Sequence, residues 1–378
     1  MAPARWIARG LAGPALLLAG AACAASPASG STPVAARSAE RAPPASLPIP
    51  ASPAESLVHS AREWCVSGGA PLVGHPVVDA AARVYFATSD GYLHAFESDG
   101  RYRFSYTVQG TPLGSVSLRP GDGAILLGTT RRLVYAIGQA GSLKWSFETL
   151  TPVWSGIVPL DRDTVSFVGL DRHLYALGTG GGAKFRVKIQ GQPVGEPIVT
   201  RRGLVWVPLS DGVARIENAW KQKHLPLPAA VDVALHSGDG LLVRSGGEAT
   251  LFAESGDVLD RKQVVEVGGS ESAQVFLFAG GRGAWRSAAG EREFEFGEAR
   301  APSGALFADA SWLAIPLEDG RALVQGSDGE TETVVVGSAA LERIQMGPSG
   351  KRLIVSTREG DVCSVRLRSA GSPSTRAR

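Results

Sequence analysis

A motif of about 40 residues recurs along this 378-residue chain, and it restricts the possible folds more than any other feature. Its first copy, Arg83–Phe104, holds three short runs of β-branched and aromatic residues separated by two Asp-Gly turns. Asp-Gly between such runs favours a hairpin, because glycine accepts a positive φ without a Cβ clash. The motif therefore predicts three antiparallel strands.

Two further copies, Val134–Trp145 and Leu174–Phe185, show what this sheet would pack against. In every copy an alanine lies nine positions before a large aromatic residue. The alanines are 41 and then 40 residues apart, and the pairs are Ala95 and Phe104, Ala136 and Trp145, and Ala176 and Phe185. A three-stranded sheet cannot bury both its faces alone. A period near 40 with about four strands per unit is typical of a β-propeller blade.

The pattern predicts an all-β fold, a single eight-bladed β-propeller over residues 57–368. The agreement with the repeat motif is weaker in the fourth to sixth blades. It is poorest in the fifth blade, which is represented by Leu241–Val243 and Thr250–Ala253, so seven blades remain an alternative. The last blade lacks an outer strand at its end. The segment Ala61–Val66, with Trp64 in the aromatic position, is expected to supply that strand and close the ring, so that only short protected edges remain.

This closure places Cys65 on a strand next to Cys363. A register with Trp64 opposite Cys363 would aim the two sulfurs at opposite faces, whereas a shift of one residue or a bulge would bring them together. In an oxidising compartment neighbouring thiols bond. Both a disulfide between Cys65 and Cys363 and a pair of buried free thiols remain open.

The first 22 residues have the features of a secretion signal, with Arg5 and Arg9 before an apolar run too short to span a bilayer. The run ends in a segment that resembles a bacterial lipobox, which predicts lipidation of Cys23, although Gly20 stands where leucine is usual. Ordinary cleavage near Ala22 is the alternative. For such lipoproteins, Ala24 after the cysteine favours the periplasmic face of the outer membrane.

Two other segments have a composition that does not support a core. Residues 23–56 are rich in Pro, Ala and Ser, and they are expected to form a flexible linker after the lipid anchor. Residues 369–378 are expected to be a disordered tail.

Composition and motifs argue against several classes of function. A net charge of +2 with no basic cluster argues against nucleic acid as a partner. The chain has no nucleophile elbow and no phosphate loop. Its aspartates before glycines, such as Asp90, are interpreted as turn formers. The six histidines lack metal-ligand spacing, and they are His59, His75, His94, His173, His224 and His236. We therefore predict no catalytic, cofactor-binding or metal-binding residues.

Two aromatic residues leave alternatives open. Trp220 lies beside Lys221 and Lys223, a combination suited to an interface, although a divergent outer strand of the fourth blade is the preferred interpretation. Trp154 is expected on the inner strand of the third blade. It could form a stacking floor in the central channel, but we expect it to fill the narrow centre of the propeller.

The repeat unit V-Y-x-x-[TS]-x-D-G-x-L-x-A-[LF]-x-x-x-G-x-x-x-W is similar to that of the PQQ-like (pyrroloquinoline-quinone-type) β-propeller family. The likeness covers about residues 60–368 and is clearest in the first three blades. The lipobox-like signal, the linker and the single propeller together resemble the BamB group of outer-membrane assembly lipoproteins. This resemblance implies one of two functions, a binding scaffold without cofactor or a dehydrogenase that holds the quinone and Ca²⁺.

The residues favour the scaffold. The chain has no adjacent cysteine pair of the kind that stacks on the quinone, and its one asparagine, Asn218, makes an amide-and-carboxylate Ca²⁺ site improbable. We therefore expect a non-enzymatic cell-envelope scaffold without cofactors, attached to the membrane by its lipid anchor. Its partners would be envelope proteins, with components of the outer-membrane barrel-assembly machinery as the specific hypothesis. A PQQ/Ca-dependent oxidoreductase and an envelope polysaccharide-binding protein are the alternatives.

Overall fold

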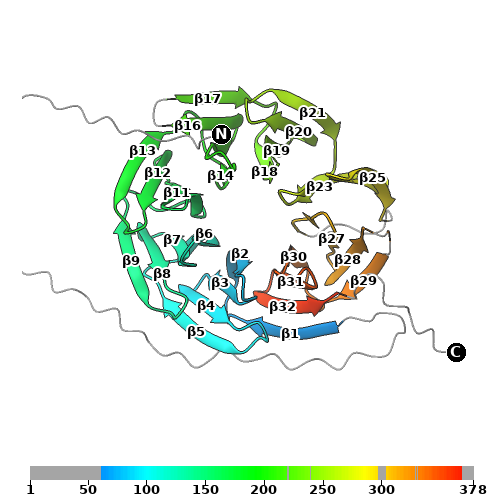
Figure 1. Ribbon diagram of the computed structural model, residues 1–378, viewed down its shortest axis with the longest axis horizontal. Coiled ribbons are helices and arrows are strands. Elements are labelled where there is room, and N and C mark those ends of the chain that lie inside the picture. Colours follow the sequence, from blue (N-terminus) through cyan, green and yellow to red (C-terminus); the bar gives the residue numbers. More distant parts are fainter. Residues whose placement is uncertain are drawn as a thin grey trace, which may run out of the picture.

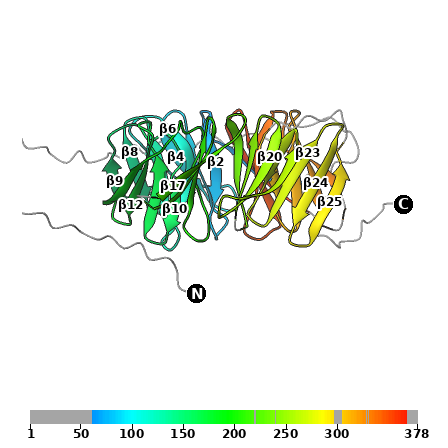
Figure 2. The same ribbon diagram turned by 90° about the horizontal axis from the view of Figure 1, so that it is seen from above.

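The computed structural model describes residues 61–218, 221–238, 240–296, 304–327, 329 and 331–367. These residues form eight four-stranded antiparallel sheets arranged around a central axis (Figure 1). In each sheet the first strand lies nearest the axis and the last lies at the circumference. Viewed from the side, the sheets form a flat disc (Figure 2). The predicted all-β, eight-bladed propeller is confirmed, and the seven-bladed alternative is wrong.

Blades one to four follow the chain in order, from the axis outward. Their strands are β2 (Leu72–Val78), β3 (Val84–Thr88), β4 (Tyr92–Phe96) and β5 (Tyr102–Thr107); β6 (Pro112–Leu118), β7 (Ile125–Thr129), β8 (Leu133–Ile137) and β9 (Leu143–Glu148); β10 (Val158–Asp161), β11 (Thr164–Val168), β12 (His173–Gly178) and β13 (Ala183–Lys188); and β14 (Ile198–Val199), β15 (Val205–Leu209), β16 (Gly212–Asn218) and β17 (Lys221–Pro226).

Blades five to seven repeat this order, and blade eight takes its outer strand from the beginning of the described chain. Their strands are β18 (Val231–Ser237), β19 (Gly240–Ser245), β20 (Glu248–Ala253) and β21 (Val258–Gln263); β22 (Glu266–Gly269), β23 (Ala273–Phe278), β24 (Arg282–Ser287) and β25 (Gly290–Glu295); β26 (Phe307–Ala308), β27 (Trp312–Pro316), β28 (Arg321–Gly326) and β29 (Thr331–Val335); and β30 (Leu341–Met346), β31 (Arg352–Thr357), β32 (Asp361–Arg366) and β1 (Ala61–Ser67).

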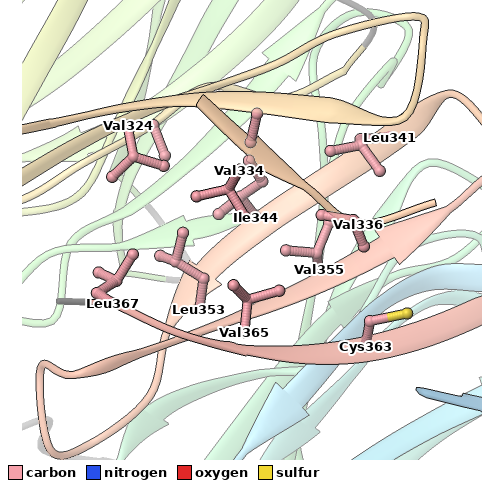
Figure 3. Packing of buried hydrophobic residues seen from close by; sticks show 12 residues of the cluster. Val324, Val334, Val336, Leu341, Ile344, Leu353, Val355, Cys363, Val365 and Leu367 are labelled. Carbon is pink, nitrogen blue, oxygen red and sulfur yellow. The ribbon is translucent and has the colours of Figure 1, made fainter. Parts of the chain in front are cut away.

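The hydrophobic core lies between adjacent blades. Every residue of β3, β7, β11 and β15 is buried, because the middle strands of a blade are covered on both faces by its neighbours. The outer strands β9 and β21 instead alternate between half-buried and exposed residues. Figure 3 shows one such interface, where Val324 and Val334 of blade seven pack in a cluster with Ile344, Val355 and Val365 of blade eight.

The repeated aromatic residue and the repeated turn glycine meet across blade boundaries. A Cβ atom on Gly141 of blade two would lie 2.9 Å from the ring of Phe104 in blade one, and one on Gly181 of blade three would lie 3.0 Å from the ring of Trp145 in blade two. The outer strands of blades one and two thus place an aromatic ring over the last hairpin of the next blade. In these blades the period of the repeat is therefore also the period of an interblade contact.

The N-terminal strand makes the same contact and closes the ring. Trp64 of β1 packs over Gly100 of blade one, and its Nε1 donates a hydrogen bond of 3.1 Å to the carbonyl oxygen of Ser98. Strand β1 pairs antiparallel with β32, which confirms the predicted closure.

The predicted register of this closure is wrong by one residue. Trp64 lies opposite Ser364, and Cys65 lies opposite Cys363, after a bulge between Arg62 and Trp64. Ser364 follows Gly360 by four residues, as Ala95 follows Gly91, so Ser364 and not Cys363 holds the position of the repeated alanine. With this register the two sulfurs meet, and Cys65 and Cys363 form a disulfide across the closure.

The contact between Gly100 and Trp64 should contribute to the free energy of unfolding. Gly100 has φ of +82°, and a Cβ there would lie 2.6 Å from the Trp64 ring. We expect Gly100→Ala to lower the free energy of unfolding by about 2–3 kcal/mol, from left-handed strain and displacement of the ring. Gly329→Ala is the matched control, because Gly329 has φ of +88° but nothing within 4 Å of its Cβ position.

The control should lose only about 1 kcal/mol. Denaturant unfolding of both variants measures the difference. Equal losses would contradict the docking role of Trp64.

Candidate functional site

The first strands of the eight blades enclose a central cavity of about 870 Å³. This volume is within the range of small-molecule sites, roughly 300–1,000 Å³. Four carboxylates, two arginines and two histidines line it, which are Glu196, Asp232, Glu266, Glu342, Arg343, Arg358, His75 and His236. The cavity is therefore a concave surface that offers charged side chains of both signs to a ligand.

Irregular pairing of the first strands places polar groups on this cavity. The register of β2 shifts between Val73 and Val77, that of β18 shifts at Asp232, and that of β30 shifts at Glu342. A bulge bends a strand and re-aims its side chains, and bulges are common next to active sites. The shifted segments carry His75, Asp232 and the pair Glu342 and Arg343, all of which line the cavity.

Glycines let blades two, three and four meet closely beside the axis. Gly114 has φ of +69°, and a Cβ on it would lie 2.0 Å from the backbone nitrogen of Gly156. A Cβ on Gly156 would in turn lie 2.7 Å from a carboxylate oxygen of Glu196. The Glu196 side chain therefore crosses blade three, where its Oε1 accepts a hydrogen bond of 2.7 Å from the backbone N–H of Ser115 in blade two.

His75 lies beside this crossing. Its Nδ1 is 2.5 Å from Oγ of Ser115. Burial, with a smaller effect of the Arg343 charge, lowers the pKa of His75 to about 3. The imidazole is therefore neutral at neutral pH, and its ring nitrogens offer one donor and one acceptor to the cavity and its wall.

Arg343 projects from the bulge of β30. Burial lowers the pKa of its guanidinium, and the nearby Glu196 and Glu342 carboxylates oppose that shift. Among the described residues the guanidinium makes no hydrogen bond and no ion pair, although it lines the cavity. The five N–H donors of an arginine are thus left to whatever fills the space.

Charged groups of blades five and six lie close to one another on another part of the wall. Arg244 Nη1 lies 3.2 Å from Glu266, and its Nε lies 3.8 Å from Asp232. Burial raises the pKa of Glu266 above its usual range. His236 Nδ1 lies 3.8 Å from the carboxylate of Glu271. Arg343 therefore differs from the charged groups of this wall in lacking a direct partner.

The neutrality of His75 gives a pH prediction. In the unfolded chain a histidine titrates near 6.5, so between pH 6.5 and 3 the unfolded state binds the extra proton and stability falls as pH falls. We expect wild type to lose about 2–3 kcal/mol more than His75→Gln between pH 7 and pH 4, after allowing for water in the cavity. Urea unfolding at both pH values measures this difference, and equal losses would contradict the buried neutral state.

The residues singled out in the sequence lie away from this cavity or outside the described residues. Cys23 and Trp220 lie outside them. Lys221 and Lys223 are exposed on β17, the outer strand of blade four, and Lys221 Nζ pairs with Glu217 at 2.6 Å. Residues 221–226 therefore form the outer strand of blade four, in agreement with the preferred interpretation of this segment. Trp154 does not line the cavity and so is not a stacking floor there.

The sequence prediction missed the residues that do line the cavity. A usable signal existed, because each of the first four blades begins with a proline–aliphatic pair followed by a short stretch that contains glycine. The first strand of a blade faces the axis, so polar residues beside those glycines, such as His75, Ser115 and Glu196, were candidates. The pairing of Glu196 with Ser115 depends on contact between blades and has no local sequence signal.

The cavity does not fit the quinone and Ca²⁺ that the PQQ-like repeat implies. No phenylalanine, tyrosine or tryptophan is among its lining residues, so no aromatic ring is available to stack on a flat quinone. Within the described ranges no group of three His, Cys, Asp or Glu side chains is placed to hold a metal ion. Cys65 and Cys363 are bonded at the ring closure and leave no cysteine pair for the cavity.

Comparison with known proteins places the fold. No protein-family model and no curated sequence matches the chain. Among solved structures, BamB from Moraxella catarrhalis is similar with a TM-score of 0.64 and 13% identity, over 82% of this chain and 100% of that one. The chain shares the propeller fold of BamB. The computationally designed Ika8 protein (TM-score 0.63, 12% identity) and virginiamycin B lyase from Staphylococcus aureus (0.55, 10%) each match 80% of this chain and 98% of their own.

These identities show a common fold and carry no function by themselves. The described part of the chain has no helix long and apolar enough to cross a membrane.

Proposed function

We propose that this protein is a non-enzymatic binding scaffold of the cell envelope that assists the assembly of outer-membrane β-barrel proteins. The observation that carries the proposal is the match of its eight-bladed propeller to the whole length of BamB. The lipobox-like segment before Cys23 and the linker after it support the same assignment from the sequence. The barrel-assembly role is what the BamB-like combination of features implies.

The disulfide supports an extracytoplasmic location. Cys65 and Cys363 are bonded although 298 positions separate them in the chain. Structural disulfides persist in oxidising compartments such as the bacterial periplasm and are rare in the cytosol. A propeller secreted by its signal segment and attached through Cys23 would fold where this bond is stable.

The cavity supports a binding role more than redox catalysis. Its residues do not fit a stacked quinone with Ca²⁺, as described above. The absence of aromatic rings on the lining also gives no support to a polysaccharide channel, since sugars commonly bind against such rings. The proposal therefore rests on the match to BamB and on the lipobox-like segment and linker of the sequence.

Affinity purification from envelopes of the source organism tests the proposal. The full-length protein, tagged at its C-terminus and expressed from its own promoter, is cross-linked and purified. Barrel-assembly components should be enriched at least tenfold over an unrelated lipoprotein with the same tag. Purification without any such component, together with unchanged levels of outer-membrane barrel proteins in a deletion strain, would contradict the role and leave the fold assignment intact.

A further inference from the structure

The guanidinium of Arg343 points to a ligand that the scaffold role does not require. It comes from a bulge in β30 that aims both Glu342 and Arg343 at the axis. The carbonyl oxygen of Glu342 is fixed by a hydrogen bond of 2.8 Å from the Ala305 N–H. The half-buried guanidinium faces the cavity and has no protein hydrogen-bonding partner among the described residues, so its donors are available to a ligand there.

The charges around Arg343 restrict the kind of ligand. An arginine fork binds a carboxylate through two parallel hydrogen bonds. Glu196 and Glu342 are close enough to influence its charge, so the cluster of one arginine and two carboxylates has a net negative charge. A multiply charged anion such as phosphate would be repelled by those carboxylates. A ligand with both a carboxylate and an ammonium group would satisfy both signs.

Neutral groups complete the site. His75 is uncharged at neutral pH, and it and Ser115 line the cavity beside Glu196. Glu196 uses Oε1 for the Ser115 N–H, and no hydrogen bond to its Oε2 is found among the described residues. One carboxylate oxygen is therefore available for an ammonium group. The apolar part of the lining, which includes Val194, Val233 and Leu306, suits a short aliphatic body.

We infer that the central cavity binds a small zwitterion, an amino acid or short peptide, with its carboxylate on Arg343 and its ammonium group on Glu196 and Glu342. Blades one, two, four and eight all contribute to this site, so it exists only in the closed ring. The inference stands on the cavity alone and does not depend on the barrel-assembly role.

Isothermal titration of the mature protein with L-alanyl-L-alanine and with L-alanine tests the inference. Acetate presents the negative charge alone, and methylammonium presents the positive charge alone. At matched ionic strength, each should bind at least tenfold more weakly than whichever of L-alanyl-L-alanine and L-alanine binds more tightly. Arg343→Gln should weaken binding of that zwitterion at least tenfold. Arg282→Gln is the control, because Arg282 is exposed on β24, does not line the cavity, and its loss should change affinity less than twofold.

Circular dichroism establishes that each variant is folded. If Arg343→Gln does not fold, Arg343→Lys takes its place, and the loss of the two-pronged geometry should still weaken binding severalfold. Binding of neither probe by wild type would overturn the inference. So would an unchanged affinity in the Arg343 variant, or acetate binding as tightly as the dipeptide.

Discussion

Replacing Cys65 and Cys363 together by alanine is expected to lower the free energy of unfolding by about 4–5 kcal/mol. The disulfide joins residues 298 positions apart, so it restricts nearly the whole unfolded propeller. In the chain-entropy model the stabilisation grows with the logarithm of the closed loop, which places this bond near the upper end of the scale. Chemical denaturation of oxidised wild type and of the double variant gives the difference directly.

Cys23→Ala is the matched control for this experiment. It removes the remaining cysteine, which lies outside the ring closure, and should leave the unfolding of the propeller unchanged when compared in unlipidated protein. Reduced wild type should behave like the double variant. A loss below about 1 kcal/mol would mean that the pairing of β1 with β32 and the docking of Trp64 are sufficient to hold the ring closed.

Gly114→Ala is expected to lower the free energy of unfolding by about 4 kcal/mol or more. Its Cβ would lie 2.0 Å from the backbone nitrogen of Gly156, and backbone atoms cannot move aside as a flexible side chain can. The left-handed φ of +69° adds strain of about 1 kcal/mol. Blades two and three would have to separate beside the axis.

Gly203→Ala isolates the effect of crowding. Gly203 has φ of +78° and nothing within 4 Å of its Cβ position, so only about 1 kcal/mol should be lost there. Denaturation of the two variants under the same conditions measures the gap. Similar losses would contradict the close approach of the blades. Because Gly114 adjoins Ser115, the variant should also displace the Glu196 carboxylate.

The repeat was sufficient to predict the strands, because turn glycines and alternating apolar runs act locally. Its marks were strong in blades one to three, and the three strands predicted from Arg83–Phe104 correspond to β3, β4 and β5. In blade five the marks were almost lost, yet β18, β19, β20 and β21 form a complete sheet. Neighbouring blades on both sides supply the apolar surface that this weak sequence requires.

The register of the closure shows where a local argument failed. The strand at Ala61–Ser67 and its partner were both predicted correctly, but the bulge between Arg62 and Trp64 shifted the pairing by one residue. The turn glycine Gly360 would have identified Ser364 as the partner of Trp64. The repeated spacing from glycine to alanine was therefore a better guide than the alignment of a single aromatic residue.

The sequence was sufficient to predict the blade and the closure of the ring, since a 40-residue period with Asp-Gly turns leaves few ways to bury the sheets, and the structure settled the count at eight. The arrangement of side chains at the axis instead depends on contacts between blades. Glu196 reaches Ser115 because Gly156 lacks a side chain, and the bulge of β30 places Arg343 on the cavity. Contacts between residues so far apart in the chain follow from ring geometry, which no single repeat encodes.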